Sequence, residues 1–285
     1  MPYRLLGIDL DGTLLNSRGE VPPANLDAIR AAQEGGMLVV PCTGRAWRES
    51  RLILEQLPTL DRGVFVTGAC ICQTDTGESL NIATIEPHLA HEVVQFLRPL
   101  PESVLVFRDA NLCGHDYLVT GDGEPTVNTR WWFDVTGATV HTQHQVGPED
   151  LHHTLRVGMV APTPRIAPLT EKLRTAFGDS VLVQSFAAVQ TPDPTQSVHI
   201  LEVFAAGVDK WRGMRWIARQ HGIEAAQIAV IGDEINDVGM LSSAGCGIAM
   251  ANGIDAARAA ADHVTLSNDQ GGVAHAIGRL LAGAW

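Results

Sequence analysis

The sequence predicts an α/β protein with a doubly wound parallel-sheet core and an inserted α+β cap domain. The sheet is predicted from two apolar runs, one that ends at Asp9 and Asp11 and one that ends at Asp233. Each run has the pattern of a buried strand that is followed by carboxylates. Parallel strands bring their carboxyl ends to one edge, where ligands bind in such sheets. A change of pattern between residues 82 and 195 predicts the insertion.

The first part of the chain alternates strand and helix. Pro22-Pro23 and Gly35-Gly36 bracket the first predicted helix, as a proline start and a glycine stop would. The remaining elements follow from apolar periodicity. We expect strands at 3–10, 37–42 and 63–67, and helices at 23–34 and 47–56.

The alternation resumes late in the chain and completes the predicted core. We expect helices at 211–221, 236–244 and 271–282, with strands at 227–232, 246–250 and 263–266. Together the two pieces form a Rossmann-like domain of residues 1–81 and 196–285.

Residues 82–195 form the predicted cap. Strands are expected at 103–107 and 181–185, and helices at 86–97, 148–154 and 164–177. A module that begins and ends beside the catalytic edge can exclude water and contact substrate. We therefore expect substrate specificity to reside in this segment.

The acid pair Asp9 and Asp11 indicates metal-assisted chemistry. Side chains at i and i+2 of an extended segment point the same way, so both acids can reach one reacting centre. Carboxylates at a buried strand end need a balancing cation, and Mg²⁺ prefers oxygen ligands. Taken alone, the segment also fits a strand followed by a polar Asp-Gly turn.

Four further residues provide groups that bind a dianionic phosphate. Thr43 and Gly44 end a predicted strand with a hydroxyl and a backbone N–H, Lys210 opens a helix, and Asn236 follows Asp233. Hydroxyl, amide and ammonium donors are the usual partners of phosphate oxygens. The sequence therefore indicates a phosphate site at the edge where the acids lie.

These motifs, in this order and ending at Asp237, resemble those of the haloacid dehalogenase superfamily of phosphohydrolases, in its Cof-type branch. The resemblance covers residues 3–81 and 196–285, whereas the middle of the chain matches in length and general pattern alone. It implies a Mg²⁺-dependent phosphatase acting on a small phosphorylated metabolite, such as a sugar phosphate or a phosphorylated cofactor.

The resemblance also implies a role for each site residue. Asp9 would be the nucleophile and a metal ligand, and Asp11 the general acid and base, with its carbonyl on Mg²⁺. Asp233 would complete the metal ligands, and Asp237 would hold Asp233 and Lys210 in place. The residues implied in phosphate binding are Leu10, Thr43, Gly44, Lys210 and Asn236, and the candidate substrate contacts are Arg45 and Arg108.

The chain departs from the Cof-type pattern at two places. It has Thr67-Gly68-Ala69 where the branch usually has Asn-Gly-Ala, and Trp211 where a glycine usually follows the helix lysine. Neither change removes a catalytic group.

Composition excludes several classes of partner. The net charge of −12 argues against nucleic acid and anionic membranes, and no apolar run could span a bilayer. We expect a cytoplasmic monomer or homodimer. The five cysteines are odd in number and have no Cys-x-x-Cys spacing, so we expect buried free thiols.

Other functions stay open on the sequence. A phosphomutase would pass the phosphoryl group to a sugar, a phosphoacceptor switch would keep it on an aspartate, and a silent binding protein would transfer none. His141-x-x-His144 and His152-His153 lack a third metal ligand and indicate surface histidines. Trp131-Trp132-Phe133 could form an aromatic wall for a ring-containing substrate, but the run favours packing within the cap or against a partner subunit.

Overall fold

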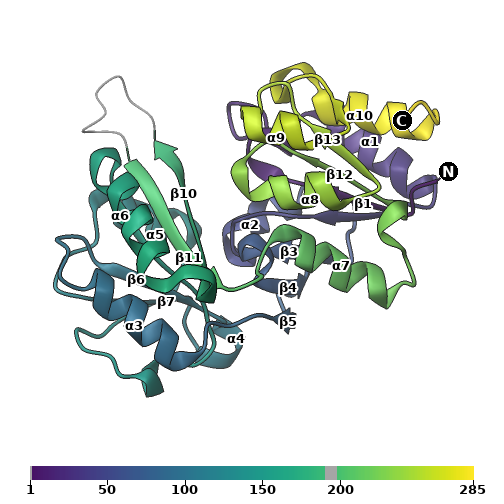
Figure 1. The fold of residues 1–285 in the computed structure, drawn as a ribbon. Coiled ribbons are helices and arrows are strands. Elements are labelled where there is room, and N and C mark those ends of the chain that lie inside the picture. The colour runs from purple at the N-terminus through teal and green to yellow at the C-terminus, as the bar shows by residue number, and fades with distance from the viewer. Residues whose placement is uncertain (1, 190–197) are drawn as a thin grey trace. The chain divides into compact units, whose positions relative to one another are not determined.

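The chain divides into two compact units. The computed structural model describes residues 2–189 and 198–285. Unit 1 consists of Met1–Asn81 and Asp209–Trp285, and unit 2 of Ile82–Val208, each built around a sheet of its own (Figure 1). Unit 1 is thus assembled from two separated pieces of chain.

Unit 1 is built on a five-stranded parallel sheet in the order β14-β13-β12-β1-β2. The central strands are fully buried runs of aliphatic residues, which suits strands covered on both faces. Their bounds are β1 (Leu5–Ile8), β2 (Leu38–Pro41), β12 (Ile228–Gly232), β13 (Cys246–Ala249) and β14 (His263–Val264).

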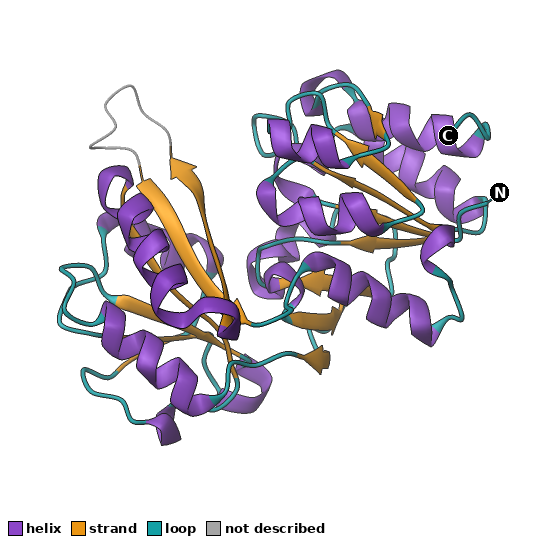
Figure 2. Cartoon of the chain, in the orientation of Figure 1, coloured by secondary structure: helices purple, strands orange, loops and turns teal. Residues whose placement is uncertain are grey.

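Helices cover both faces of this sheet (Figure 2). Alternate residues of β1 point to opposite sides: Leu6 packs in a cluster with α1 and α10, and Leu5 in a cluster with α7, α8 and α9. This arrangement is the predicted doubly wound fold. The helices are α1 (Pro23–Glu34), α2 (Trp47–Leu54), α7 (Lys210–Gln220), α8 (Val238–Ser243), α9 (Asp255–Ala260) and α10 (Gly272–Leu281).

A small sheet of β3 (Arg62–Phe65), β4 (Cys70–Gln73) and β5 (Ser79–Ile82) completes unit 1. Cys42, just after β2, bridges Val64 of β3, so the small sheet continues beside the large one. Single helical turns connect the elements. They are η1 (Leu10–Leu14), η2 (Val66–Gly68), η5 (Ala225–Gln227), η6 (Ile235–Asp237) and η7 (Asn268–Gln270).

Unit 2 is a six-stranded, mainly antiparallel sheet in the order β10-β11-β9-β6-β7-β8. Aliphatic residues of α3 and α6 pack with those of the strands in one core. The strands are β6 (Val104–Arg108), β7 (Tyr117–Thr120), β8 (Val140–Thr142), β9 (Thr154–Pro162), β10 (Val181–Val189) and β11 (Val198–Ala205). The helices are α3 (Pro87–Leu97), α4 (Ala110–Cys113), α5 (Val127–Thr136) and α6 (Thr163–Phe177), with single turns η3 (Pro148–Asp150) and η4 (Gly178–Ser180).

The structure corrects two predictions in this part of the chain. The helix expected at 148–154 is wrong, because only Pro148–Asp150 forms a turn and strand β9 begins at Thr154. The boundary expected between residues 195 and 196 lies outside the described residues. Residues 198–205, which we assigned to the core without predicting a strand there, form β11, which pairs with β9 and β10 in the sheet of unit 2.

Two global expectations concern membranes and cysteines. No helix in the described part of the chain combines the length and apolar character needed to cross a membrane. All five cysteines are free thiols, and Cys113 alone among them is half-buried, the others being buried.

Candidate active site

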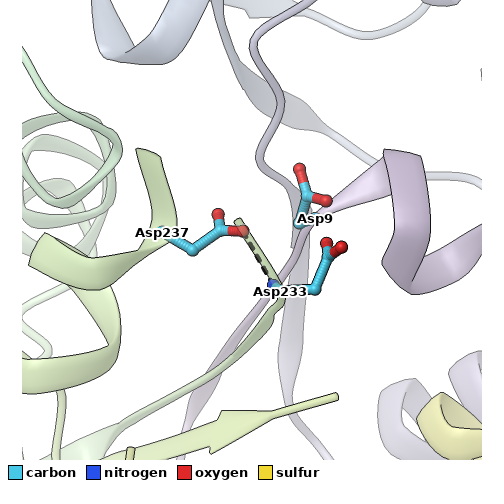
Figure 3. A group of neighbouring side chains, drawn as sticks. All are labelled: Asp9, Asp233 and Asp237. Carbon is cyan, nitrogen blue, oxygen red and sulfur yellow. Dashed lines mark hydrogen bonds between the residues drawn. The ribbon is translucent and has the colours of Figure 1, made fainter. Parts of the chain in front are cut away.

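Two neighbouring strands of unit 1 end in the acids that the sequence singled out. Strands β1 and β12 run parallel with Ile8 beside Ile231, so Asp9 and Asp233 emerge at the same edge. Asp237 follows in η6, and Figure 3 shows the three carboxylates gathered at one point. One oxygen from each lies within 4.8 Å of the others, close enough to hold one metal ion.

Lys210, the first residue of α7, carries the positive charge at this centre. Its Nζ donates to Asp9 Oδ1 at 2.7 Å and to Asp237 Oδ1 at 2.6 Å. The lysine side chain is 1% exposed. Burial alone would lower the pKa of Lys210, but the charges of Asp237 and Asp9 outweigh it and raise that pKa above its usual value. Lys210 therefore stays an ammonium ion.

Asp237 fixes the loop after β12. Its Oδ2 accepts the backbone N–H groups of Asp233 at 2.9 Å and Glu234 at 3.0 Å. Gly232 makes this contact possible, since a Cβ there would lie 2.5 Å from Asp237 Cγ. With both oxygens bound by protein donors, Asp237 orients Asp233 and Lys210.

The centre holds more negative than positive charge. The three carboxylates Asp9, Asp233 and Asp237 face one ammonium, Lys210. Burial, followed by the charge of Asp237, raises the pKa of Asp233 to about 7. Burial also raises the pKa of Asp9, against the opposing effect of Lys210. This excess of acids over cations fits a bound divalent cation, with Mg²⁺ the natural ion for oxygen ligands.

Residues to which sequence reasoning gave no role also position Asp233. Thr13 Oγ1 donates to Asp233 Oδ1 at 2.8 Å. Gly12 has φ +73°, and a Cβ there would lie 2.2 Å from Asp233 Oδ2, so only glycine fits. Asn252 Nδ2 donates to the carbonyl of Gly12 at 2.8 Å. The Gly-Thr pair directly after the two acids was the available signal for this contact.

The structure brings Thr43, Gly44 and Asn236 together. Thr43 is fully buried, and its N–H donates to Val64 O of β3. A Cβ on Gly44 would lie 3.3 Å from Asn236 Nδ2, which places the Asn236 amide against the backbone of Gly44. The Oδ1 atom of Asn236 is buried without a hydrogen-bond partner among the described residues. Leu10 is buried directly after Asp9.

Asp11 and Arg45 form a bidentate ion pair. Arg45 Nε donates to Asp11 Oδ2 at 2.7 Å, and Nη2 donates to Asp11 Oδ1 at 2.5 Å. The Asp11 side chain is 53% exposed, whereas Asp9 is buried. The two acids of the motif thus have different partners and different surroundings.

Arg108, the candidate substrate contact in the insertion, makes contacts within unit 2. Its Nε donates to His152 O at 3.1 Å, and Nη1 lies 3.3 Å from His115 Nε2. Trp131 of α5 is 59% exposed. The substrate contact proposed for Arg108 stays a prediction.

The parallel sheet, the acids at its strand ends and the lysine that opens α7 define an α/β enzyme built for charged substrates. The model of the haloacid dehalogenase-like hydrolases matches residues 6–277, and the chain belongs to that family. The Cof-type resemblance is thereby confirmed, and the protein is a phosphatase of the haloacid dehalogenase superfamily.

Relatives match the chain over nearly its whole length. YxeH of Bacillus subtilis is 30% identical over 284 residues, which is 98% of both chains. The 5-amino-6-(5-phospho-D-ribitylamino)uracil phosphatase YwtE of the same organism is 28% identical, covering 99% of both. The solved structure of the subclass IIB sugar phosphatase BT4131 is 20% identical, with a TM-score of 0.74, and covers 98% of this chain and 99% of that one. This last likeness concerns the fold.

Proposed function

We propose that the protein is a Mg²⁺-dependent phosphomonoester hydrolase that acts through an aspartyl phosphate on Asp9. The observation that carries this proposal is the buried carboxylate of Asp9 at the end of a parallel strand, bound to Lys210 and beside Asp233. A carboxylate is a poor nucleophile toward a dianion unless positive charge lies next to it. Lys210 supplies one such charge.

The first half-reaction transfers the phosphoryl group to the protein. An Asp9 oxygen attacks phosphorus while Thr43, Gly44 and Asn236 hold the phosphoryl oxygens, and Asp11 gives a proton to the leaving oxygen. Mg²⁺, bound by Asp9, Asp233 and the Asp11 carbonyl, would neutralise charge on the phosphoryl group. In the second half-reaction Asp11 takes a proton from water, which hydrolyses the acyl phosphate.

We propose that the substrate is a small phosphorylated metabolite and that unit 2 selects its leaving group. The name of YwtE, a 5-amino-6-(5-phospho-D-ribitylamino)uracil phosphatase, supports this class. All the residues assigned to the chemistry lie in unit 1. Alanine variants of Arg108, Trp131 and Trp132 should therefore redistribute kcat/KM among substrates, each lost polar contact changing it by about 5-fold to 150-fold.

The test is a panel of phosphorylated metabolites with detection of free phosphate, run with Mg²⁺ and with EDTA. We expect phosphate release that requires Mg²⁺. Isomerised sugar phosphate without free phosphate would instead identify a phosphomutase. An acyl phosphate on Asp9 that persists for hours would identify a phosphoacceptor switch, and no phosphoryl transfer at all would reject both half-reactions.

A further inference from the structure

Three successive residues of the turn η2 have left-handed backbone angles. The φ angles are +50° at Val66, +55° at Thr67 and +94° at Gly68. Such angles suit glycine but are strained for β-branched residues such as valine and threonine. Strain of this kind persists only where the surrounding structure holds it, and it concentrates at functional sites. The turn is therefore a candidate for a functional role.

Residues of the candidate active site hold this turn in place. The N–H of Thr67 donates to the carbonyl of Thr43 at 3.1 Å. On the other side, a Cβ on Gly68 would collide with the carbonyl oxygen of Asp209, the residue before Lys210. The turn is thus fixed between the segment that follows β2 and the start of α7.

The hydroxyl of Thr67 lies among the candidate phosphate-binding groups. A Cβ on Gly44 would lie 3.4 Å from Thr67 Oγ1 and 3.3 Å from Asn236 Nδ2. Two hydrogen-bonding groups, one from η2 and one from η6, therefore meet beside the backbone of Gly44. Thr67 is 1% exposed, so the protein and not bulk solvent determines where this hydroxyl points.

The ends of β2 and β3 carry the same pair of residues. Thr43-Gly44 follows β2, and Thr67-Gly68 follows β3. The two strand ends lie side by side, because Cys42 forms a parallel bridge with Val64 and the N–H of Thr43 donates to Val64 O at 2.9 Å. Two Thr-Gly pairs thus lie at the carboxyl ends of neighbouring parallel strands, where ligands bind in α/β sheets.

We propose that Thr67 is a further phosphoryl-binding residue, whose hydroxyl donates to an oxygen of the transferring phosphoryl group. The inference rests on the proposed function, because that function assigns the phosphoryl oxygens to Thr43, Gly44 and Asn236. A threonine hydroxyl rotates to suit its partner and can donate to an anionic oxygen. The asparagine that the Cof-type branch usually has at this place also carries a side-chain donor, so the departure at Thr67 keeps that capacity.

The experiment measures the Kd for inorganic phosphate by calorimetry with saturating Mg²⁺. Inorganic phosphate has no leaving group, so a change in its affinity concerns the phosphoryl oxygens alone. Thr67→Val keeps the branched shape without the donor, and its Kd should rise by about tenfold to hundredfold, as for a lost hydrogen bond to a charged group. Thr67→Ser keeps the hydroxyl, and its Kd should stay within about threefold of wild type.

Thr74→Val is the matched control. Thr74 is another buried threonine of unit 1, and its hydroxyl donates to the carbonyl of Leu60, away from the site residues. This variant should lower the melting temperature and leave the Kd for phosphate unchanged. An unchanged Kd in Thr67→Val, or a loss in Thr67→Ser as large as that in Thr67→Val, would overturn the proposal.

Two further measurements keep the result decisive. If circular dichroism shows that Thr67→Val does not fold, Thr67→Ala, which also lacks the hydroxyl, takes its place against Thr67→Ser. Wild-type protein that neither binds phosphate nor hydrolyses any phosphate ester would reject the proposed function. Wild-type protein that does both, with Thr67→Val equal to it in each, would reject the role of Thr67 alone.

Discussion

Both units bury charged side chains, but they balance the charge differently. In unit 2, Arg156 binds Glu202, and Gln184 donates to the same carboxylate at 3.2 Å, so one guanidinium faces one acid. In unit 1 a single ammonium, Lys210, faces three acids. A balanced buried pair is a structural feature, whereas an unbalanced cluster needs a further cation. The difference supports the proposal that the chemistry takes place in unit 1, without reference to any relative.

The largest effect should come from Asp9, the proposed nucleophile in the unbalanced cluster. Asp9→Asn keeps the shape of the side chain and removes its nucleophilic oxygen, so kcat should fall by more than about a thousandfold. The fold should survive, since an amide in place of a buried carboxylate relieves like-charge repulsion. Phosphate release and circular dichroism are the measurements. A folded variant that keeps more than about a tenth of wild-type kcat would reject Asp9 as the nucleophile.

Replacing the positively charged side chain in each unit, Lys210 in unit 1 and Arg156 in unit 2, tests this comparison directly. Lys210→Met and Arg156→Met should each lower the free energy of unfolding by about 3–5 kcal/mol, because each leaves a buried carboxylate uncompensated. Urea denaturation with and without Mg²⁺ then distinguishes the two variants.

Mg²⁺ should recover stability in the Lys210→Met variant more than in wild type, because the acids that remain form its site. It should stabilise Arg156→Met no more than wild type. Equal recovery in the two variants would mean that the excess charge of unit 1 is not the feature that binds the ion.

The excess of acids in unit 1 should also make the free energy of unfolding depend on pH. The pKa of Asp233 is raised from 3.8 to about 7 in the folded protein, so the folded state holds a proton that the unfolded state releases. Without metal, this contribution is complete below about pH 4 and is lost as the pH rises through about 7. At about 1.4 kcal/mol per pKa unit, its upper limit is about 4 kcal/mol.

Denaturation in EDTA at pH 5 and at pH 8 measures this loss. Asp233→Asn is the control that removes the titrating group, and its two stabilities should lie closer together than those of wild type. A loss of the same size in Asp233→Asn would assign the pH dependence to other groups.

The smallest predicted effect concerns the backbone at Thr67, whose N–H donates to the carbonyl of Thr43. Thr67 has φ +55°, a left-handed conformation that is strained for a β-branched residue and tolerated by asparagine. Thr67→Asn, which restores the usual Cof-type residue, should raise the free energy of unfolding by about 1 kcal/mol. Thermal unfolding measures the change, and Thr74→Asn, at a buried threonine outside this turn, is the comparison that should not stabilise.

Sequence reasoning located the parallel core because its signals are local. Leu5–Ile8 and Ile228–Gly232 are continuous apolar runs, and each is followed by an acid. Thr13 shows the limit of this reasoning, because its contact with Asp233 joins residues 220 apart. The pairing of Arg45 with Asp11 likewise depends on how β1 and β2 lie side by side.

Unit 2 was harder to predict because its signals conflict. Pro148 followed by two acids is typical of a helix start, but the helical turn η3 ends at Asp150. The alternation of Leu155, Val157 and Met159 on one face was the available sign of β9. Helix α5 was missed although Thr126 caps it, since its apolar residues do not form one buried stripe.

The second piece of unit 1 begins at Asp209, so it is synthesised after all of unit 2, and this order affects when unit 1 can fold. Lys210 lies 201 positions after Asp9, so a ribosome adding about 5–20 residues per second makes Asp9 at least ten seconds before the lysine that neutralises it. Strand β1 also lacks its neighbour β12 during that time. Unit 2 is one continuous stretch of chain and can finish folding first. We therefore expect a nascent chain to acquire phosphatase activity only after its last segment has emerged.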